Sequence, residues 1–384
     1  MRARRSGACG RLHGDQIHNR NSEKRLEFKE MAPNTSDSSG PPCPNVNVPL
    51  RLGIVGCGAI TQQAHLPTVL TRGDVNVTIL CDKNLARAVG LKGHFCLNSL
   101  VSSELSDVIA NSDIAVVAVP PRFHRSVCCS LLEKGLDVLC EKPLASSPEE
   151  AREMVAVAER AGRLLGVGFQ NRFLDGNSLM AAVLHEGLIG ELREIKCEFG
   201  SKQGWPMSGG DYYNAATTRG GALFDQGIHI LDRVTALFGP IEVLHFEDDS
   251  FGGVECNAFL TGRVSVGGVP IPCSMRFSWT HSLPDEIVLT GSRGTAITGR
   301  SWPESVLIRT IAMGRPAESM MSWSGKPVHQ TDKSGSHRLW ADFLDAVRTR
   351  RAPLTDGRAS IQLLETIERA YAIRSPMLQP WVMP

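Results

Sequence analysis

The sequence lacks the features that mark membrane-spanning or nucleic-acid-binding proteins. No apolar run is long enough to cross a bilayer, and 41 basic residues nearly balance 40 acidic ones, which leaves a net charge of +1. This balance gives no reason to expect a nucleic acid or an acidic membrane as a partner. With 384 residues, 42% of them hydrophobic, the chain has enough apolar material for two domains with substantial cores. We therefore expect a soluble protein.

Paired cysteines are also missing. The eleven cysteines are odd in number and form no C-x-x-C pair, so neither a disulfide framework nor a zinc site is indicated. Several lie within apolar segments, as small core residues of a reducing compartment do: Cys81, Cys128, Cys129, Cys140, Cys197 and Cys273. We expect no metal ion and a cytoplasmic location.

Residues 1–48 have no periodic apolar positions. Arginines are followed by a mixed-charge piece and then by sequence rich in serine, asparagine and proline, without the apolar core of a signal peptide. We expect a disordered N-terminal extension, with Met31 as the natural start of the protein. Sequencing the N-terminal peptide of the native protein would test this start site.

The stretch RLGIVGCGAITQQAHLP, residues 51–67, reads as a buried strand, a glycine turn and a helix. In a dinucleotide-binding βαβ unit, Gly56 would allow the tight turn and Gly58 would let the backbone approach a pyrophosphate at the helix N-terminus. Thr61 stands where the fingerprint G-x-G-x-x-G has its third glycine, so the motif is incomplete. The same residues also fit a glycine turn that closes an ordinary strand.

A second strand, residues 75–80, ends at Cys81 and Asp82. A carboxylate about 20 residues past the glycine turn can accept both hydroxyls of the adenosine ribose and would repel a 2′-phosphate. Asp82 therefore favours NAD, while the neighbouring Lys83 keeps NADP open. The alternative is that Asp82 caps a helix over residues 84–91.

The βα rhythm continues to residue 169. After a helical piece near residues 100–110, the apolar run 114–119 predicts a central strand that stops at Pro120-Pro121, and the stiff loop to His124 should border the nicotinamide. An ordinary strand-ending loop is the alternative. A helix (127–134) and a strand (137–140) lead to Glu141-Lys142-Pro143, where the lysine either pairs with Glu141 or reaches the cofactor. A helix (148–162) and a sixth strand (164–169) follow.

The second half of the chain predicts a different architecture. After Gly220-Gly221, a helix ends at Gly239-Pro240 and carries Asp225, His229 and Asp232 at i, i+4, i+7, which predicts that all three project from one face. Alternating runs then predict an antiparallel sheet with strands at 241–246, 254–260, 263–266, 271–279, 287–290 and 305–311. The helix 337–349 and the helix after Asp356 should complete an α+β domain.

Over roughly residues 50–375, these residues resemble the glucose-fructose oxidoreductase, inositol dehydrogenase and MocA (Gfo/Idh/MocA) family. The resemblance is carried by GIVGCGAI with HLP at 65–67, VAVPPRFH at 117–124, CEKPLA at 140–145, GVGFQNRF at 166–173 and GGALFDQGIHILD at 220–232. It implies an α/β fold, with an N-terminal Rossmann domain (residues 49–170) of doubly wound parallel sheet. It also implies a C-terminal α+β domain (residues 171–384) whose large open, mostly antiparallel sheet commonly mediates self-association, so a homo-oligomer is expected.

Site residues follow by matching the family motifs to this sequence. The cofactor, NAD with NADP as the alternative, would contact Gly56, Gly58, Ala59, Ile60, Asp82, Pro120, Pro121, His124, Glu141, Lys142 and Gln170. The substrate would contact Lys142, Arg172, Asp225 and His229, of which Lys142, Asp225 and His229 form the expected catalytic set. Gln170-Asn171 depart from the Asn-Arg or Arg-Arg of many relatives, which leaves the substrate open.

The expected activity is hydride exchange between a secondary hydroxyl of a sugar, polyol or cyclitol-like compound and nicotinamide. His229 would act as general acid/base, Lys142 would stabilise charge on the reacting oxygen, and Asp225 would orient His229 or a substrate hydroxyl. Two alternatives remain: a glycosidase that retains its NAD and acts by transient oxidation and elimination, and a non-catalytic nucleotide-sensing protein. Trp205, Asp211, Tyr212 and Tyr213 would suit a sugar site, but equally a surface loop.

Overall fold

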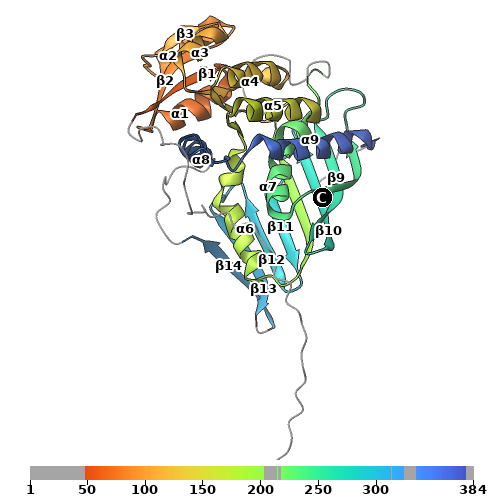
Figure 1. Ribbon diagram of the computed structural model, residues 1–384. Helices are drawn as coiled ribbons and strands as arrows, with labels where there is room; N and C mark the ends of the chain where they lie inside the picture. Colours follow the sequence, from red (N-terminus) through yellow and green to blue (C-terminus); the bar gives the residue numbers. More distant parts are fainter. Residues whose placement is uncertain (1–47, 203–213, 215–217, 313, 324–333, 378–384) are drawn as a thin grey trace, which may run out of the picture.

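The computed structural model describes residues 48–202, 214, 218–312, 314–323 and 334–377. The expected N-terminal extension lies outside these residues except for Val48, and so do Trp205, Asp211, Tyr212 and Tyr213. Figure 1 shows two layered units, a parallel sheet near the N-terminus and a longer sheet built mainly from the second half of the chain.

The first sheet has six parallel strands in the order β3-β2-β1-β4-β5-β6. These strands are β1 (Leu50–Val55), β2 (Val75–Cys81), β3 (Leu100–Ser102), β4 (Ile114–Val117), β5 (Asp137–Cys140) and β6 (Leu165–Val167). This order is that of a doubly wound dinucleotide-binding sheet, which confirms the expected fold class. One expectation was wrong, because residues 100–110 begin with the short edge strand β3 before the helix α3 (Leu105–Asn111).

Helices cover both faces of this sheet. Side chains alternate across β4, so Ile114 and Val116 pack with one helical layer while Ala115 and Val117 pack with the other. One layer contains α1 (Leu66–Val69) and α2 (Leu85–His94); the other contains α3, α4 (His124–Glu133) and α5 (Pro148–Ala161). Because both faces are covered, β4 is apolar and buried at all four positions.

Helix α8 (Ser336–Thr349) packs on the first sheet, although it lies late in the chain. Its apolar stripe, which includes Trp340 and Phe343, joins the core formed by Leu52 and Ile54 of β1. We had expected this helix to complete the second domain. Its amphipathic pattern correctly predicts a helix with one buried face, but the pattern does not specify which sheet that face covers.

The second sheet has nine strands in the order β14-β13-β12-β11-β7-β10-β9-β8-β15. They are β7 (Leu192–Gly200), β8 (Glu242–Asp248), β9 (Asn257–Val266), β10 (Val269–Ser278), β11 (Glu286–Gly291), β12 (Gly294–Gly299), β13 (Ser305–Ala312), β14 (Arg315–Ser322) and β15 (Arg374–Pro376). Its pairing is antiparallel except for β7 with β10 and β8 with β15, so the expected mostly antiparallel sheet is confirmed. The two strands expected at 254–260 and 263–266 form the single strand β9.

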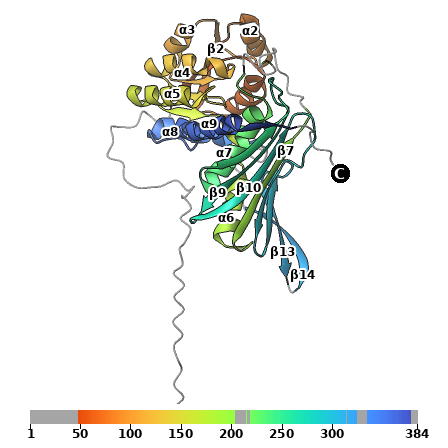
Figure 2. The same cartoon turned by 90° about the vertical axis from the view of Figure 1, so that its right-hand side faces the viewer.

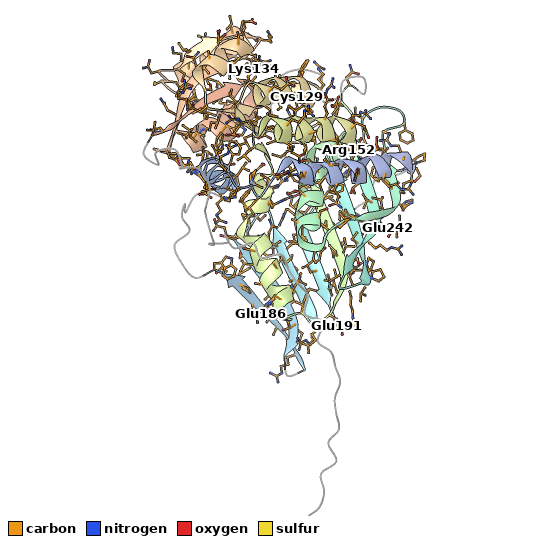
Figure 3. All side chains as sticks on the ribbon, viewed as in Figure 1. Cys129, Lys134, Arg152, Glu186, Glu191 and Glu242 are labelled. Atoms are coloured by element: carbon orange, nitrogen blue, oxygen red, sulfur yellow. The ribbon has the colours of Figure 1, made fainter. Side chains whose placement is uncertain are left out.

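One face of the second sheet is covered by α6 (Asp175–His185), α7 (Ile228–Phe238) and α9 (Gly357–Ala372), as Figures 1 and 2 show. The other face carries charged pairs, among them Arg276 with Glu198. Figure 3 shows charged side chains spread around the surface, including Lys134, Arg152, Glu186, Glu191 and Glu242. Among the described residues, no helix is both long and apolar enough to cross a membrane.

Candidate active site

The glycine turn after β1 forms one end of a cavity of about 980 Å³. Gly56 has a φ of +100°, and a Cβ there would lie 2.4 Å from the carbonyl oxygen of Ala118, so no other residue fits without displacing β4. A Cβ added to Gly58 would meet nothing within 4 Å, because this residue borders the open cavity. The turn is thus shaped for a ligand to approach its backbone.

Thr61 explains how the turn forms without a third glycine. Its hydroxyl is buried and donates to the carbonyl oxygen of Gly56 at 2.6 Å, which closes the turn from within. The chain over Thr61–His65 is a π-helical segment (η1) that precedes α1. Such wide turns often occur at functional sites, and this one directs His65 into the interior.

Asp82 lies beside the glycine turn on the wall of the same cavity. Its carboxylate accepts the backbone N–H of Cys57 and that of Asn84, each at 2.8 Å, so both oxygens are oriented by the backbone. The cap of α2 is Asn84, whose side chain accepts from the N–H of Ala86. The alternative interpretation of Asp82 as the helix cap is therefore wrong. Lys83 and Arg87 line the cavity next to it.

The carboxyl ends of the central strands form the floor of the cavity, where Pro120, Glu141, Lys142 and Gln170 all line the wall. Pro121 and His124 do not. His124 is fully buried, with Nδ1 2.9 Å from the carbonyl oxygen of Pro143 and Nε2 2.8 Å from that of Val119. It therefore connects the loop after β4 to the loop after β5, instead of contacting a cofactor as we had expected.

Lys142 joins the two halves of the molecule. Its Nζ donates to the Oδ1 of Asp225 at 2.8 Å and to the carbonyl oxygen of Asp225 at 2.9 Å. Lys142 follows β5 of the first sheet, whereas Asp225 belongs to a second π-helical segment, η5 (Leu223–Gly227), that leads into α7 over the second sheet. Both side chains are largely shielded from water, and both line the cavity. The ion pair thus links the loop after β5 of the first sheet to the segment that leads into α7 over the second sheet.

His65 stands behind this pair and was not among the expected site residues. Its Nε2 lies 2.9 Å from the Oε1 of Glu141, and its Nδ1 accepts the indole N–H of Trp340 at 3.2 Å. Because Nδ1 accepts, Nε2 carries the proton and faces the carboxylate. Burial alone would raise the pKa of Glu141, but His65 and Lys142 outweigh it and lower that pKa below its usual value. Glu141 therefore remains ionised beside Lys142.

His229 and Gln226 line the cavity beside Asp225. Within the described part of the chain, the Nδ1 of His229 and the Oε1 of Gln226 are buried atoms without a hydrogen-bond partner. Burial, reinforced by the positive charges of Lys142, Arg300 and Arg233, lowers the pKa of His229 well below its usual value. The imidazole is therefore neutral at physiological pH, with an unpaired nitrogen available to a polar ligand.

Asp232 and Arg172 do not share this wall. Asp232 is fully buried and forms an ion pair with Arg172, whose Nε lies 3.1 Å away and whose Nη1 donates to the carbonyl oxygen of Leu354. The expectation that Asp232 shares a face with Asp225 was wrong, because the π-helical segment breaks the 3.6-residue period on which it rested. Arg172 fastens the loop after β6 to α7 and does not line the cavity.

Arg233 and Arg300 also line the cavity, and the sequence interpretation missed both. Arg233 lies one turn after His229 on α7, and Arg300 follows β12. Arg233 directly follows the Asp232 that ends the family motif, and Arg300 lies in a segment without any motif. Only the fold brings them together.

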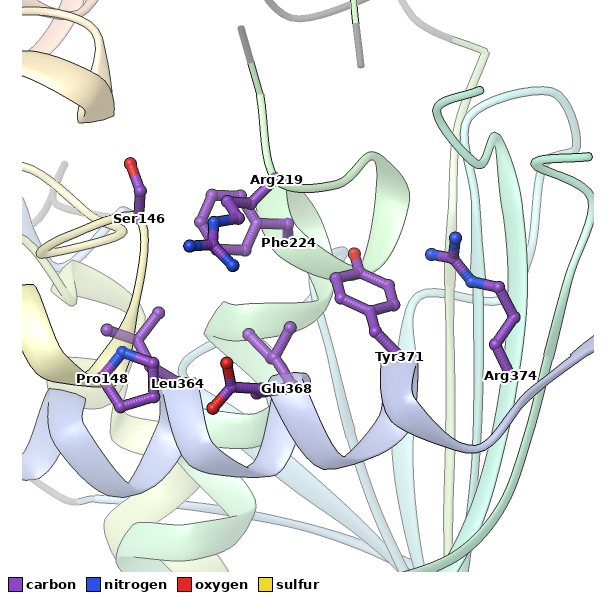
Figure 4. A pocket seen from close by; sticks show the side chains of 9 residues that line it. Ser146, Pro148, Arg219, Phe224, Leu364, Glu368, Tyr371 and Arg374 are labelled. Carbon is purple, nitrogen blue, oxygen red and sulfur yellow. The ribbon is translucent and has the colours of Figure 1, made fainter. Parts of the chain in front are cut away.

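A smaller cavity of about 240 Å³ lies on the other side of η5 (Figure 4). Leu364, Glu368 and Tyr371 reach it from α9, and Arg219 and Phe224 border it from the segment before Asp225. The Tyr371 hydroxyl donates to the buried Glu255 at 2.8 Å. These contacts support η5 from behind. No group of three or more potential metal ligands occurs among the described residues.

The large cavity fits a dinucleotide. Its volume is at the upper end of the range of about 300 to 1,000 Å³ that is typical of ligand sites, and its wall runs from the glycine turn and Asp82 to Lys142 and His229. Gly58 leaves room for close approach at one end, and unpaired polar atoms occur at the other. These residues would hold the cofactor.

Two family models match the chain. Residues 50–169 match the model described as "Oxidoreductase family, NAD-binding Rossmann fold", and residues 178–297 match "GFO/IDH/MocA C-terminal domain". The first match spans the six strands of the first sheet, and the second extends from β7 into β12 of the second sheet.

Curated relatives are similar over different lengths. D-glucoside 3-dehydrogenase of Escherichia coli (strain K12) is 34% identical over 193 residues, which are 50% of this chain and 54% of that enzyme. The chain thus spans about half the length of this relative. A dTDP-3,4-didehydro-2,6-dideoxy-alpha-D-glucose 3-reductase of Actinomadura kijaniata is 28% identical, over 78% of this chain and 95% of that enzyme.

Solved structures share the fold. Levoglucosan dehydrogenase, in complex with NADH and L-sorbose, has a TM-score of 0.74 at 15% identity, over 85% of this chain and 96% of that one. A 3-ketoreductase from Actinomadura kijaniata, in complex with NADP and TDP-benzene, has a TM-score of 0.72 at 20% identity, over 85% and 98%. These likenesses concern the fold alone. With both family models matched, the chain belongs to the Gfo/Idh/MocA family of NAD(P)-dependent oxidoreductases.

Proposed function

We propose that this protein exchanges a hydride between a secondary hydroxyl of a sugar, polyol or cyclitol-like compound and a nicotinamide cofactor. One observation carries the proposal: Lys142, Asp225 and His229 converge on the same cavity as the glycine turn and Asp82. The three side chains can transfer a proton and stabilise a developing charge, and the glycine turn with Asp82 can hold a dinucleotide. When bound, the nicotinamide supplies the redox chemistry.

The three side chains divide the remaining tasks. Lys142 donates to the reacting oxygen and stabilises the negative charge that develops as the hydroxyl loses its proton. His229, neutral because of its lowered pKa, accepts that proton at a ring nitrogen. Asp225 holds Lys142 through a hydrogen bond of 2.8 Å. Glu141, which lies against His65, accepts the backbone N–H of Lys142 at 3.1 Å and so orients the lysine as well.

The substrate class is supported by the relatives. The glucoside 3-dehydrogenase and the dTDP-sugar 3-reductase are both named for chemistry at position 3 of a sugar, and levoglucosan dehydrogenase was crystallised with L-sorbose. A polyhydroxy compound also suits this wall, because His229 and Gln226 present unpaired polar atoms that hydroxyls can satisfy.

NAD is the proposed cofactor, because Asp82 presents an oriented carboxylate where a 2′-phosphate would have to lie. We further propose a cytoplasmic protein that self-associates. The nine cysteines that the structure describes are free thiols, which suits a reducing compartment, and none of the described helices covers the other face of the second sheet.

Alanine substitution of Lys142 or His229 tests the proposed function. We expect NADH formation with at least one member of a panel of polyols, aldoses and cyclitols. Lys142→Ala and His229→Ala should each lower turnover by on the order of a hundredfold or more and leave NAD affinity and melting temperature nearly unchanged, because positioned proton transfer contributes roughly 10² to 10⁴. Matched controls are Lys134→Ala and His185→Ala, at exposed sites remote from the cavity.

Three outcomes would count against this assignment. Variants that melt normally, bind NAD and keep wild-type turnover would remove Lys142 and His229 from the mechanism. Turnover that falls only in proportion to folded protein would make them structural residues. Glycoside cleavage by protein with retained NAD, and with no net NADH released, would favour the glycosidase alternative.

Cofactor choice is tested at Asp82. We expect wild-type protein to have a higher kcat/KM with NAD than with NADP, and Asp82→Ser to shift the ratio toward NADP by about tenfold or more, equivalent to ~1.4 kcal/mol of differential binding. The reason is that, without the carboxylate of Asp82, the cations Lys83 and Arg87 would border the site of a 2′-phosphate. Asp345→Ser, at an exposed position on α8, is the control. A wild type that prefers NADP, or an unchanged ratio, would contradict the role of Asp82.

The lowered pKa of His229 predicts a pH effect on stability. Below about pH 6.5 the unfolded chain protonates this histidine, whereas the folded protein keeps it neutral until a much lower pH, so acid favours unfolding. The stability of wild type relative to His229→Asn should therefore fall between pH 7.5 and 5. Urea unfolding of both proteins across this range measures the difference. A difference that does not change with pH would show that His229 titrates normally.

Self-association is tested by light scattering on the purified protein. We expect a mass of two or four chains. The mass of a charge-reversed double variant on the uncovered face, Glu198→Lys with Arg276→Glu, should be measured under the same conditions. A single-chain mass at micromolar concentration would contradict this part of the proposal.

A further inference from the structure

Arg233 is a buried cation on the wall of the large cavity. Arg233 is only 3% exposed, and it lies one helical turn beyond His229 on α7. Its Nε donates to the Oδ1 of Asn177 on α6 at 2.7 Å, and the Nδ2 of Asn177 donates in turn to the carbonyl oxygens of Asn171 and Arg172. The guanidinium is thus held in one orientation by neutral groups.

This guanidinium has no carboxylate partner in the part of the chain that the structure describes. The adjacent acid, Asp232, is already engaged by Arg172. Burial lowers the pKa of Arg233 to about 10; the charge of Arg300 acts in the same direction, and the charge of Asp232 opposes it. A buried charge without a counter-charge is costly, and an anion in the cavity would relieve that cost.

The other cations at this end of the cavity each have a carboxylate nearby. Lys142 is paired with Asp225 at 2.8 Å. Arg300 contacts Asp285 at 3.4 Å, but its side chain is 58% exposed and still reaches the cavity wall. Arg233 is therefore the buried cation at this end that lacks a carboxylate. Its planar fork of N–H donors matches the two oxygens of a carboxylate.

We propose that the natural substrate carries a carboxylate group that binds Arg233, so that the class is a sugar acid or another polyhydroxy acid. The proposal rests on the proposed function and specifies its substrate. His229, one turn earlier on α7, would receive the hydroxyl to be oxidised, while Arg233 receives the carboxylate and Arg300 contacts it from the solvent side. The spacing along one helix then fixes which hydroxyl meets His229.

The test compares compounds that differ only by the acid group: glucose with glucuronate, galactose with galacturonate, and glucitol with gluconate. We expect the acid of at least one pair to have a kcat/KM at least about tenfold higher than its neutral partner, since a hydrogen-bonded charge pair is worth roughly tenfold to a hundredfold. Arg233→Met should reduce this acid preference by tenfold or more. Arg263→Met, in an exposed pair with Glu242, should leave it unchanged.

A second measurement keeps the proposal testable without turnover. Binding of each acid to the wild-type protein–NADH complex is followed by NADH fluorescence. Arg300→Met and Arg233→Lys are measured in the same way, in case Arg233→Met does not fold. We expect the acids to bind at least tenfold more tightly than the neutral compounds, and each variant to weaken acid binding.

The outcomes separate this inference from the proposed function. Neutral compounds turned over as well as, or better than, their acids would overturn the carboxylate assignment and leave the oxidoreductase function intact. Preference for glucose 6-phosphate over every carboxylate would also overturn it. Acids that bind the NADH complex through Arg233 without any turnover would support the inference and contradict the proposed function.

Discussion

The ion pair between Lys142 and Asp225 is the contact on which the candidate site depends. It joins the loop after β5 of the first sheet to η5 above the second sheet, with the lysine nitrogen 2.8 Å from the carboxylate. Because Lys142 follows a strand of the first sheet and Asp225 lies over the second, the pair connects the two sheets. Both partners line the cavity, so its wall is built from residues of both parts of the fold.

Buried polar groups hold this pair in place. Trp340 of α8 fixes His65, His65 faces Glu141, and Glu141 accepts the backbone N–H of Lys142. Because α8 packs on the first sheet, a late segment of the chain orients the loop that carries Lys142. Such fixed donors can stabilise charge without first reorganising, which is what an oxidoreductase of this kind requires of its protein. Arg233 is held by Asn177 in the same way, but it lacks an acid.

The sequence predicts the parts of this arrangement that depend on local pattern. Short apolar runs such as residues 114–117 identify the parallel strands, and the glycine turn and Glu141-Lys142-Pro143 mark the carboxyl edge where a cofactor binds.

Tertiary contacts between distant segments, which no local spacing encodes, set the positions of His65, Trp340, Arg233 and Arg300. His124 was misassigned because a loop position at the strand end does not reveal whether a side chain faces the ligand or the interior. The π-helical segment at Asp225 was missed because helix periodicity assumes 3.6 residues per turn.

A crystal structure of the protein with bound NADH tests the central claim most directly, since it asks whether the cofactor and the proposed catalytic side chains share one cavity. The account predicts a dinucleotide that runs from Gly56, Gly58 and Asp82 to Lys142 and His229, with the Lys142–Asp225 pair intact. NADH bound elsewhere, or bound with its nicotinamide away from Lys142 and His229, would contradict it.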